Sequence, residues 1–494
     1  MALNLGARAI SGFKWSGLSA AANAAFQLGF AAALARLLRP ADFGLLAMAM
    51  VALRLFSNFS QLGLGAAMVQ KEQLSPEDVR CALGLTWLVC VPAGAAVVLA
   101  APAFGLFFRD DAVVPLVRVL SLNLLLVGLG TVSMSLLRRA MRYRAQAVIE
   151  TLSYALGYGV LGVAFAWAGA GVWTLVVTTF AQSAIALVGA WALTRHPLWP
   201  SLRGDRAGLL GYGARYTLVG FLEFVGATVD TALIGRLLGG ATLGVYNRAA
   251  MLTNQPVVHA GGVMSRVLFP LVSTVQRDRR KTAGVLLLGM AVTGVLGGAL
   301  SFGLSAAAGD VVRVILGPTW GDAAPVVQVL ALATPLLLMV QVCGVVCDAL
   351  ALLRFKVVTQ CAHLLVLSGL IFVLYPLGLI GVAWAVVGAE LLRFGLYSVF
   401  LTRRLECTRA DVVRVLAGVA LTAALAWGGC FAATSAAARW GLGPMPALGL
   451  DMLAGLLALV LGALAQLRLL EGTEPARFAD ASVPGWQRLR ARLG

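Results

Sequence analysis

Arg54, Asn58 and Gln61 recur at intervals of four and then three residues within one long apolar segment. In a helix these intervals place the three side chains on one stripe. A charged side chain inside a membrane costs about 2.5–3.5 kcal/mol or more, so such a stripe usually faces a water-filled cavity. A guanidinium group beside two amides can bind an anionic ligand that also has hydroxyl or amide groups. This stripe is therefore the first candidate binding surface.

Other apolar segments carry polar residues at similar depth. In the first segment Asn23 and Gln27 share a face, and in the eighth Asn254 is the repeat partner of Arg54. The remaining cations are Lys14, Arg215, Arg248 and Arg266. Each either lines the same cavity or extends to water at the membrane surface.

Acidic residues are rarer in the apolar segments. Glu223 and Asp230 lie two turns apart on the seventh segment, and either could carry a proton or a sodium ion. Glu390 and Arg393 stand at i and i+3, which favours mutual neutralisation over a ligand site.

Motifs of catalysis and metal binding are missing from the sequence. It has no GxxxxGK[ST] phosphate loop, kinase motif set, GxSxG elbow or HExxH pair. Cys343 and Cys347 have helical spacing but no second ligand pair, so helix packing explains them better than a metal. We expect no catalytic residues, no cofactor and no metal, and therefore no enzyme.

An internal repeat organises the chain. ARLLRPADFG at 35–44 returns as GRLLGGATLG at 235–244, and GVW at 171–173 returns as GVAW at 381–384. The order of the matches never reverses. A same-sense repeat of about two hundred apolar residues is typical of a transporter built from two homologous helix bundles.

The composition indicates whether water or lipid surrounds the folded chain. Sixty per cent of the residues are hydrophobic, 12% are charged, and the mean hydropathy is +0.90. Such a chain cannot keep a water-soluble surface, so it is an integral membrane protein. Runs long enough to cross a bilayer as helices are expected at 12–35, 43–69, 82–107, 113–137, 145–167, 171–194, 210–235, 243–269, 283–308, 324–350, 357–375, 378–401, 412–434 and 446–469.

These fourteen spans form three predicted parts. Residues 1–200 make an amino-terminal lobe of six spans, 201–405 a second lobe of six, and 406–494 a final hairpin and tail. The net charge of +17 comes from cations between the spans, about four times as many on one side as on the other. The positive-inside rule then predicts that both termini are cytoplasmic.

Seven segments together resemble a known family: ISGFKWSG, LARLLRPADFGLLAM, LGLGAAMVQKEQLSPED, GAGVWTLV, TALIGRLLGGATLGVYNRA, RVLFPLVSTVQRD and LGPTWGDAAPVVQVL. They are similar to the polysaccharide transporters of the multidrug/oligosaccharidyl-lipid/polysaccharide (MOP) exporter superfamily, in particular to Wzx-type, WzxC-like flippases. Gln61 and Glu223 stand where such relatives commonly have other residues.

The resemblance implies a V-shaped, all-α, MOP/MATE-like fold in the bacterial cytoplasmic (inner) membrane. It also implies an activity: flipping of undecaprenyl-diphosphate-linked oligosaccharide units to the periplasmic leaflet for exopolysaccharide, O-antigen or capsule export. Arg54 and Arg248 would then face the diphosphate, and Asn23, Gln27, Asn58 and Asn254 the sugar.

The implied partners are the lipid-linked substrate, membrane lipids, a polysaccharide polymerase and a chain-length regulator, but no nucleic acid. Two alternatives remain open from the residues alone. A lipid II flippase would need the same cations, whereas a MATE-like cation-coupled drug antiporter would favour acidic residues in the cavity.

Overall fold

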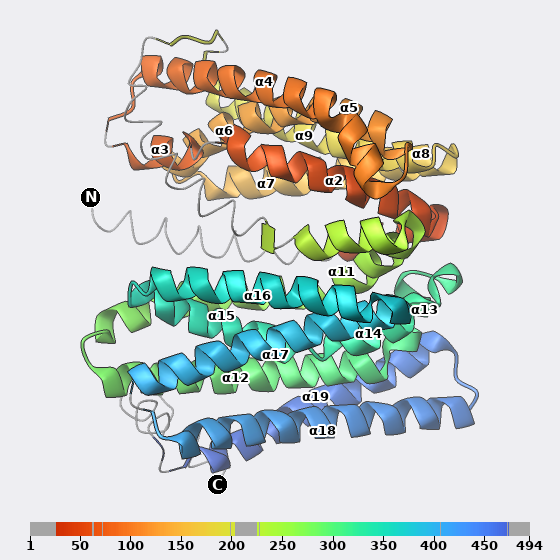
Figure 1. The fold of residues 1–494 in the computed structure, drawn as a ribbon, viewed down its shortest axis with the longest axis vertical. Coiled ribbons are helices and arrows are strands. Elements are labelled where there is room, and N and C mark those ends of the chain that lie inside the picture. Colours follow the sequence, from red (N-terminus) through yellow and green to blue (C-terminus); the bar gives the residue numbers. More distant parts are fainter. Residues whose placement is uncertain are drawn as a thin grey trace. The chain divides into compact units, whose positions relative to one another are not determined.

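A computed structural model describes residues 26–61, 64–71, 73–197, 199–202, 225–226, 228–405, 407–471 and 473. The regular structure of these residues is helical throughout. The chain divides into two compact units, Met1–Asn247 and Arg248–Gly494, which we describe separately (Figure 1).

The first described helix of the first unit is Phe26–Leu37, and residues 228–238 form another helix near the end of this unit. Between them lie α2 Pro40–Gln61, α3 Leu64–Gln70, α4 Pro76–Phe108, α5 Val113–Ser121, α6 Asn123–Arg139, α7 Tyr143–Tyr154, a π-helix Ala155–Leu161, α8 Gly162–Trp167 and α9 Val172–Thr194. The division between the units falls within α11 Gly240–Val275.

The second unit continues from α11 with antiparallel helices that lie side by side (Figure 1). These are α12 Arg279–Ala306, α13 Ala308–Ile315, α14 Ala323–Ala331, α15 Thr334–Ala349, α16 Leu353–Leu374, α17 Gly378–Arg404, α18 Arg409–Arg439 and α19 Pro444–Leu469, with 3₁₀ turns Pro318–Trp320 and Tyr375–Leu377.

The prediction of an all-helical membrane protein is confirmed. Among the described residues, eight helical segments are long and apolar enough to cross a membrane, or nine if one bent pair is a single span. One of the eight, Leu353–Arg404, covers two expected spans. Its 52 residues would extend about 78 Å at 1.5 Å per residue, whereas α16 and α17 fold back along each other at Tyr375–Leu377.

One expected span is bent and another is not. The span at 113–137 is a single segment, Val113–Arg139, although α5 and α6 are separated at Leu122. The span at 324–350 bends by 42° between α14 and α15. Pro335, the second residue of α15, lacks the backbone N–H that would continue the preceding helix.

The repeated stretch forms a reciprocal contact in the first unit. A Cβ atom added to Gly44 would overlap the carbonyl of Gly240, and one added to Gly244 would overlap the carbonyl of Pro40. Pro40 and Gly240 are repeat partners, as are Gly44 and Gly244. The first turns of α2 and α11 therefore cross with their backbones in contact, which only glycine permits.

The core of the second unit gathers around α12 and α15. Cys343 and Cys347 are fully buried there, among Val342, Val346 and Leu287. These thiols pack as small apolar groups.

Candidate translocation site

Helix α2 presents Arg54 on its exposed side. The buried residues Ala49, Ala52 and Leu53 pack into the first unit, whereas Arg54 projects from almost the opposite side. Asn58 lies on the same continuous helix, one turn further on. The expected helical stripe therefore has its backbone in place, and its cation lies outside the packed core.

Helix α11 repeats this arrangement in the second unit. Asn254, the repeat partner of Arg54, is exposed, and Ala249 and Leu252 are buried. Arg248 is half-buried, and its Nη1 lies 3.5 Å from the sulfur of Met251. Arg248 and Asn254 therefore lie on different sides of α11.

Several predicted residues cannot be located. Lys14, Asn23, Arg215 and Glu223 lie outside the described residues. The side chains of Asn58, Gln61 and Arg266 are likewise undescribed, although their backbones are helical. The roles assigned to them stay predictions.

Gln27 lies half-buried beside an aromatic stack. Phe30, one turn further along the same helix, lies 6.2 Å from the ring of Tyr154, and Tyr154 stacks on Tyr158 at 4.7 Å. Gly159 permits this approach, because a Cβ there would overlap the Phe30 ring. Tyr158 belongs to the π-helical turn, a rare conformation often found at functional sites.

Asp230 is held by three donors. Tyr246 of α11 donates its hydroxyl to Oδ2 at 2.8 Å, and the backbone N–H of Thr231 donates to Oδ1 at 2.6 Å. The Thr231 hydroxyl lies 3.3 Å from the same Oδ1. A carboxylate bonded in this way can be structural or can exchange a proton, so ion coupling stays a hypothesis.

The structure adds a third residue to one expected pair. Arg393 Nη2 lies 2.9 Å from Glu390 Oε2, which confirms the predicted neutralisation. His363 of α16 lies 3.6 Å from the other carboxylate oxygen, and both His363 and Glu390 are buried. His363 Nδ1 also lies 3.3 Å from the carbonyl oxygen of Ala389, 26 residues later in the chain. Sequence reasoning missed the role of His363 because this contact joins two different helices.

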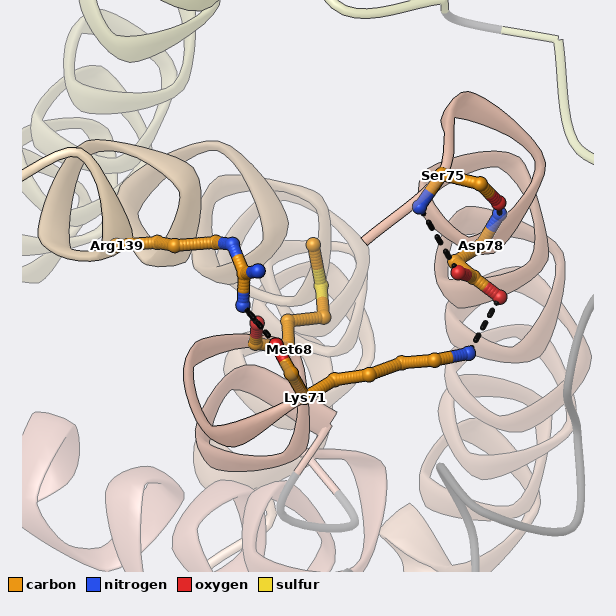
Figure 2. Close-up of polar contacts among 5 residues, drawn as sticks. All are labelled: Met68, Lys71, Ser75, Asp78 and Arg139. Atoms are coloured by element: carbon orange, nitrogen blue, oxygen red, sulfur yellow. Dashed lines mark hydrogen bonds and ion pairs between the residues drawn. The ribbon is translucent and has the colours of Figure 1, made fainter. Parts of the chain in front are cut away.

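A polar clamp fixes the loop after α2 and α3 (Figure 2). Arg139, from the last turn of α6, donates to the carbonyls of Met68, at 3.0 Å, and Lys71 at the end of α3. Lys71 in turn bonds Asp78 at 2.8 Å, and Asp78 forms a capping box with Ser75 at the start of α4. The clamp thus ties three helix ends together. The Ser75–Asp78 capping box is a local pattern, whereas Arg139 lies 71 residues after Met68, so its part in the clamp depends on how the helices pack.

No cluster of metal-ligating side chains exists within the part of the chain that the structure describes. Of the cations predicted for the site, the side chains of Arg54 and Arg248 are among the described residues. A planar guanidinium suits a phosphate group, because it can donate two parallel hydrogen bonds.

Comparison with known proteins identifies the family. A family described as "Polysaccharide biosynthesis protein" matches residues 33–325, which is more than half of the chain. The match includes α2, α11 and the reciprocal contact between them.

Individual relatives agree with this match. The succinoglycan biosynthesis transport protein ExoT of Rhizobium meliloti is 29% identical over 330 residues, covering 65% of this chain and 65% of the relative. The lipopolysaccharide biosynthesis protein WzxC of Escherichia coli is 25% identical over 339 residues, covering 66% and 67%. The chain thus aligns with only about two thirds of the length of these relatives.

Solved structures show the fold. The lipid II flippase MurJ in an inward closed conformation has a TM-score of 0.71 at 12% identity, over 93% of this chain and 99% of that structure. An inward-facing multidrug resistance MATE family transporter of the MOP superfamily has a TM-score of 0.59 at 15% identity, over 78% and 95%. The protein belongs to the polysaccharide biosynthesis protein family, and its fold is similar to that of these two membrane transporters.

Proposed function

We propose that the protein flips undecaprenyl-diphosphate-linked oligosaccharide units from the cytoplasmic to the periplasmic leaflet of the bacterial inner membrane. The units would serve exopolysaccharide, O-antigen or capsule export, as in WzxC-like flippases. The family match over residues 33–325 carries this proposal.

The reciprocal contact of α2 and α11 supports alternating access. In alternating access two homologous lobes rock as rigid bodies, and a close crossing of equivalent helices can serve as their pivot. Gly44 and Gly244 supply such a crossing, because a side chain at either position would overlap the backbone of the opposite helix. We propose that the lobes, residues 1–200 and 201–405, pivot at this crossing, with 406–494 as an additional hairpin and tail.

Charge and aromatic groups suit the two parts of this substrate. A diphosphate brings negative charge across about 30 Å of hydrocarbon and needs cations along a shielded path. Arg54, exposed on α2, would contact the diphosphate. Gln27 and the ring of Tyr158 would contact the sugar, because aromatic rings offer an apolar face and amides bond hydroxyl groups.

We also propose fourteen spans with both termini in the cytoplasm. The capping arginines support this orientation, because Arg139 and Arg142 bind carbonyls at the ends of α3 and α9 that would face the cytoplasm. Reporter fusions after Arg144, Lys281 and Lys356 are expected to read cytoplasmic, and a fusion after Ala170 periplasmic. One reporter on the opposite face would remove a span from the proposal.

Reconstituted vesicles test the substrate. We would place the full chain in vesicles with a fluorescent polyprenyl-diphosphate oligosaccharide and follow protection of the sugar from a membrane-impermeant glycosidase. Lipid II and a cationic dye serve as separate substrates. Faster movement of the oligosaccharide is expected, and movement of lipid II or of the dye alone would overturn the proposal.

A further inference from the structure

A groove of about 840 Å³ runs along the surface of α17 in the second unit. Leu391, Leu392 and Leu396 line it on α17, and Phe355 of α16 forms a wall. The lining is apolar except at one end, where Arg403 and Arg404 lie. The groove therefore combines a long apolar channel with a cationic end.

Missing side chains create the floor of the groove. Gly388 and Gly395 are seven residues apart and so share one side of α17. No atom lies within 4 Å of a Cβ added to Gly395, so that position opens directly onto free space. A larger residue there would fill the groove without displacing the protein.

The wall of the groove consists of packed aromatic rings. The ring of Phe355 stacks on Phe400 with centroids 3.7 Å apart, and it meets Tyr397 edge-on at 5.4 Å. These contacts hold α16 against α17, which Figure 1 shows side by side. The channel is thus preformed, as ligand sites usually are.

The cationic end extends into a second pocket. This pocket of about 530 Å³ shares Arg403 and Val399 with the groove, and it adds Ser398, Thr402 and Arg409. Arg403 therefore lies between two open spaces, with hydroxyl groups and another arginine on the far side.

Acidic side chains nearby are directed to other cations. Asp348 pairs with Lys356, and Asp411 with Arg414. Residues 403–414 contain four arginines against one glutamate and one aspartate, and that glutamate, Glu406, is outside the described residues. A net positive charge thus remains at this end of α17.

The groove is about as long as one leaflet of a bilayer is thick. Gly388 and Phe400 are separated by about 18 Å along the helix, close to the roughly 15 Å half-thickness of the hydrocarbon core. Arg403 and Arg404 follow one turn later, in the last turn of α17. The predicted orientation places this turn at the depth of lipid headgroups on the cytoplasmic side. Basic pockets between helices on that side suit phosphate-bearing headgroups.

We propose that this groove binds an anionic phospholipid of the cytoplasmic leaflet. An acyl chain lies over Gly388 and Gly395, and the phosphate contacts Arg403, Arg404 and Arg409. The lipid fills space between α16 and α17 and places an anion at their ends. This site does not depend on which substrate the protein moves.

Lipid binding to the purified full chain tests the site. Native mass spectrometry would count bound phosphatidylglycerol and, separately, bound phosphatidylcholine over a series of lipid concentrations. Wild type is expected to retain phosphatidylglycerol more tightly. Arg403→Gln and Arg404→Gln should each weaken that retention about fivefold, since one arginine near a membrane surface contributes about that factor.

Matched controls separate this site from general effects. Gly395→Leu should lower retention of phosphatidylglycerol, whereas Gly369→Leu, at an equally open glycine on α16, should not. Arg468→Gln, at the exposed end of α19, should also leave retention unchanged.

Three results would overturn the proposal. They are equal retention of the two lipids by wild type, an equal loss in the control variants, and displacement of the lipid by inorganic phosphate at the same concentration, which would indicate a site for free phosphate. If Gly395→Leu fails to fold, the two arginine variants and their control still decide the matter.

Discussion

Helices α2 and α11 begin with equivalent residues and then diverge. Gly44 and Gly244 occupy matching positions in the crossing of the first turns. Further along, Arg54 and Asn254 also match in position and exposure, but only the first is charged. The repeat thus retains the residues that bring the two backbones together, and it varies the side chains that project away from the core.

Charge also differs between the last spans of the two copies. The match of GVW at 171–173 with GVAW at 381–384 pairs Glu390 with Thr179 and Arg393 with Gln182. The second copy therefore has an ion pair where the first has neutral groups. In this chain the two copies thus match in position but differ in charge.

Substitutions at the crossing of α2 and α11 are expected to cause the largest loss of folded protein. Gly44→Leu and Gly244→Leu would each drive a side chain into the opposite backbone, so we expect little folded protein in the membrane. Overpacking by even one or two methylenes typically costs about 1–3 kcal/mol, and backbone contact leaves less room to relax. Membrane-inserted protein would be measured by quantitative immunoblotting after extraction.

Gly449→Leu on α19 serves as the control, because a Cβ there meets nothing within 4 Å. If Gly44→Leu accumulates as well as Gly449→Leu, the crossing is not close-packed. The conclusion that the two copies share a backbone contact at Gly44 and Gly244 would then be wrong.

Removal of the cation from the buried Glu390–Arg393 pair is expected to cause the next largest loss of stability. Arg393→Ala leaves Glu390 buried without its cation, which should lower stability by about 3–5 kcal/mol. At the matching position in the first copy, Gln182→Ala should cost less, because no charge is left behind. Thermal unfolding of the purified variants measures both.

A double variant shows whether charge is the cause. Glu390→Gln with Arg393→Met removes both charges and should recover most of the loss. A double variant as unstable as Arg393→Ala alone would assign the effect to packing instead.

Sequence patterns predicted what lies along one helix. The i, i+3 spacing indicated the Glu390–Arg393 pair, and apolar length indicated the helical class. They could not predict that Gly44 contacts the repeat of its own motif, or that His363 approaches Glu390, because those contacts depend on how helices pack. The π-helical turn at Ala155–Leu161 has no sequence signature of its own.

The clamp at α3 gives a smaller effect. Arg139→Ala removes hydrogen bonds to the carbonyls of Met68, Val69 and Lys71, so we expect a loss of about 1.5–3 kcal/mol. The neighbouring Arg138 is exposed, and Arg138→Ala should cost less than about 0.5 kcal/mol. Equal losses in the two variants would show that general surface charge matters more than the clamp.

Arg54 tests the central proposal that the guanidinium of this residue, on α2, contacts the substrate diphosphate. The measurement is the amount of lipid-linked repeat units on the cytoplasmic leaflet, normalised to inserted protein, for Arg54→Ala, Arg54→Lys and Asn254→Ala. We expect Arg54→Ala to abolish export and Arg54→Lys to keep part of it, because the charge survives without bidentate geometry. Asn254→Ala should lose less export than Arg54→Ala, because it removes an amide and not a charge. Normal export by well-folded Arg54→Ala, or equal losses in Arg54→Ala and Asn254→Ala, would contradict the account.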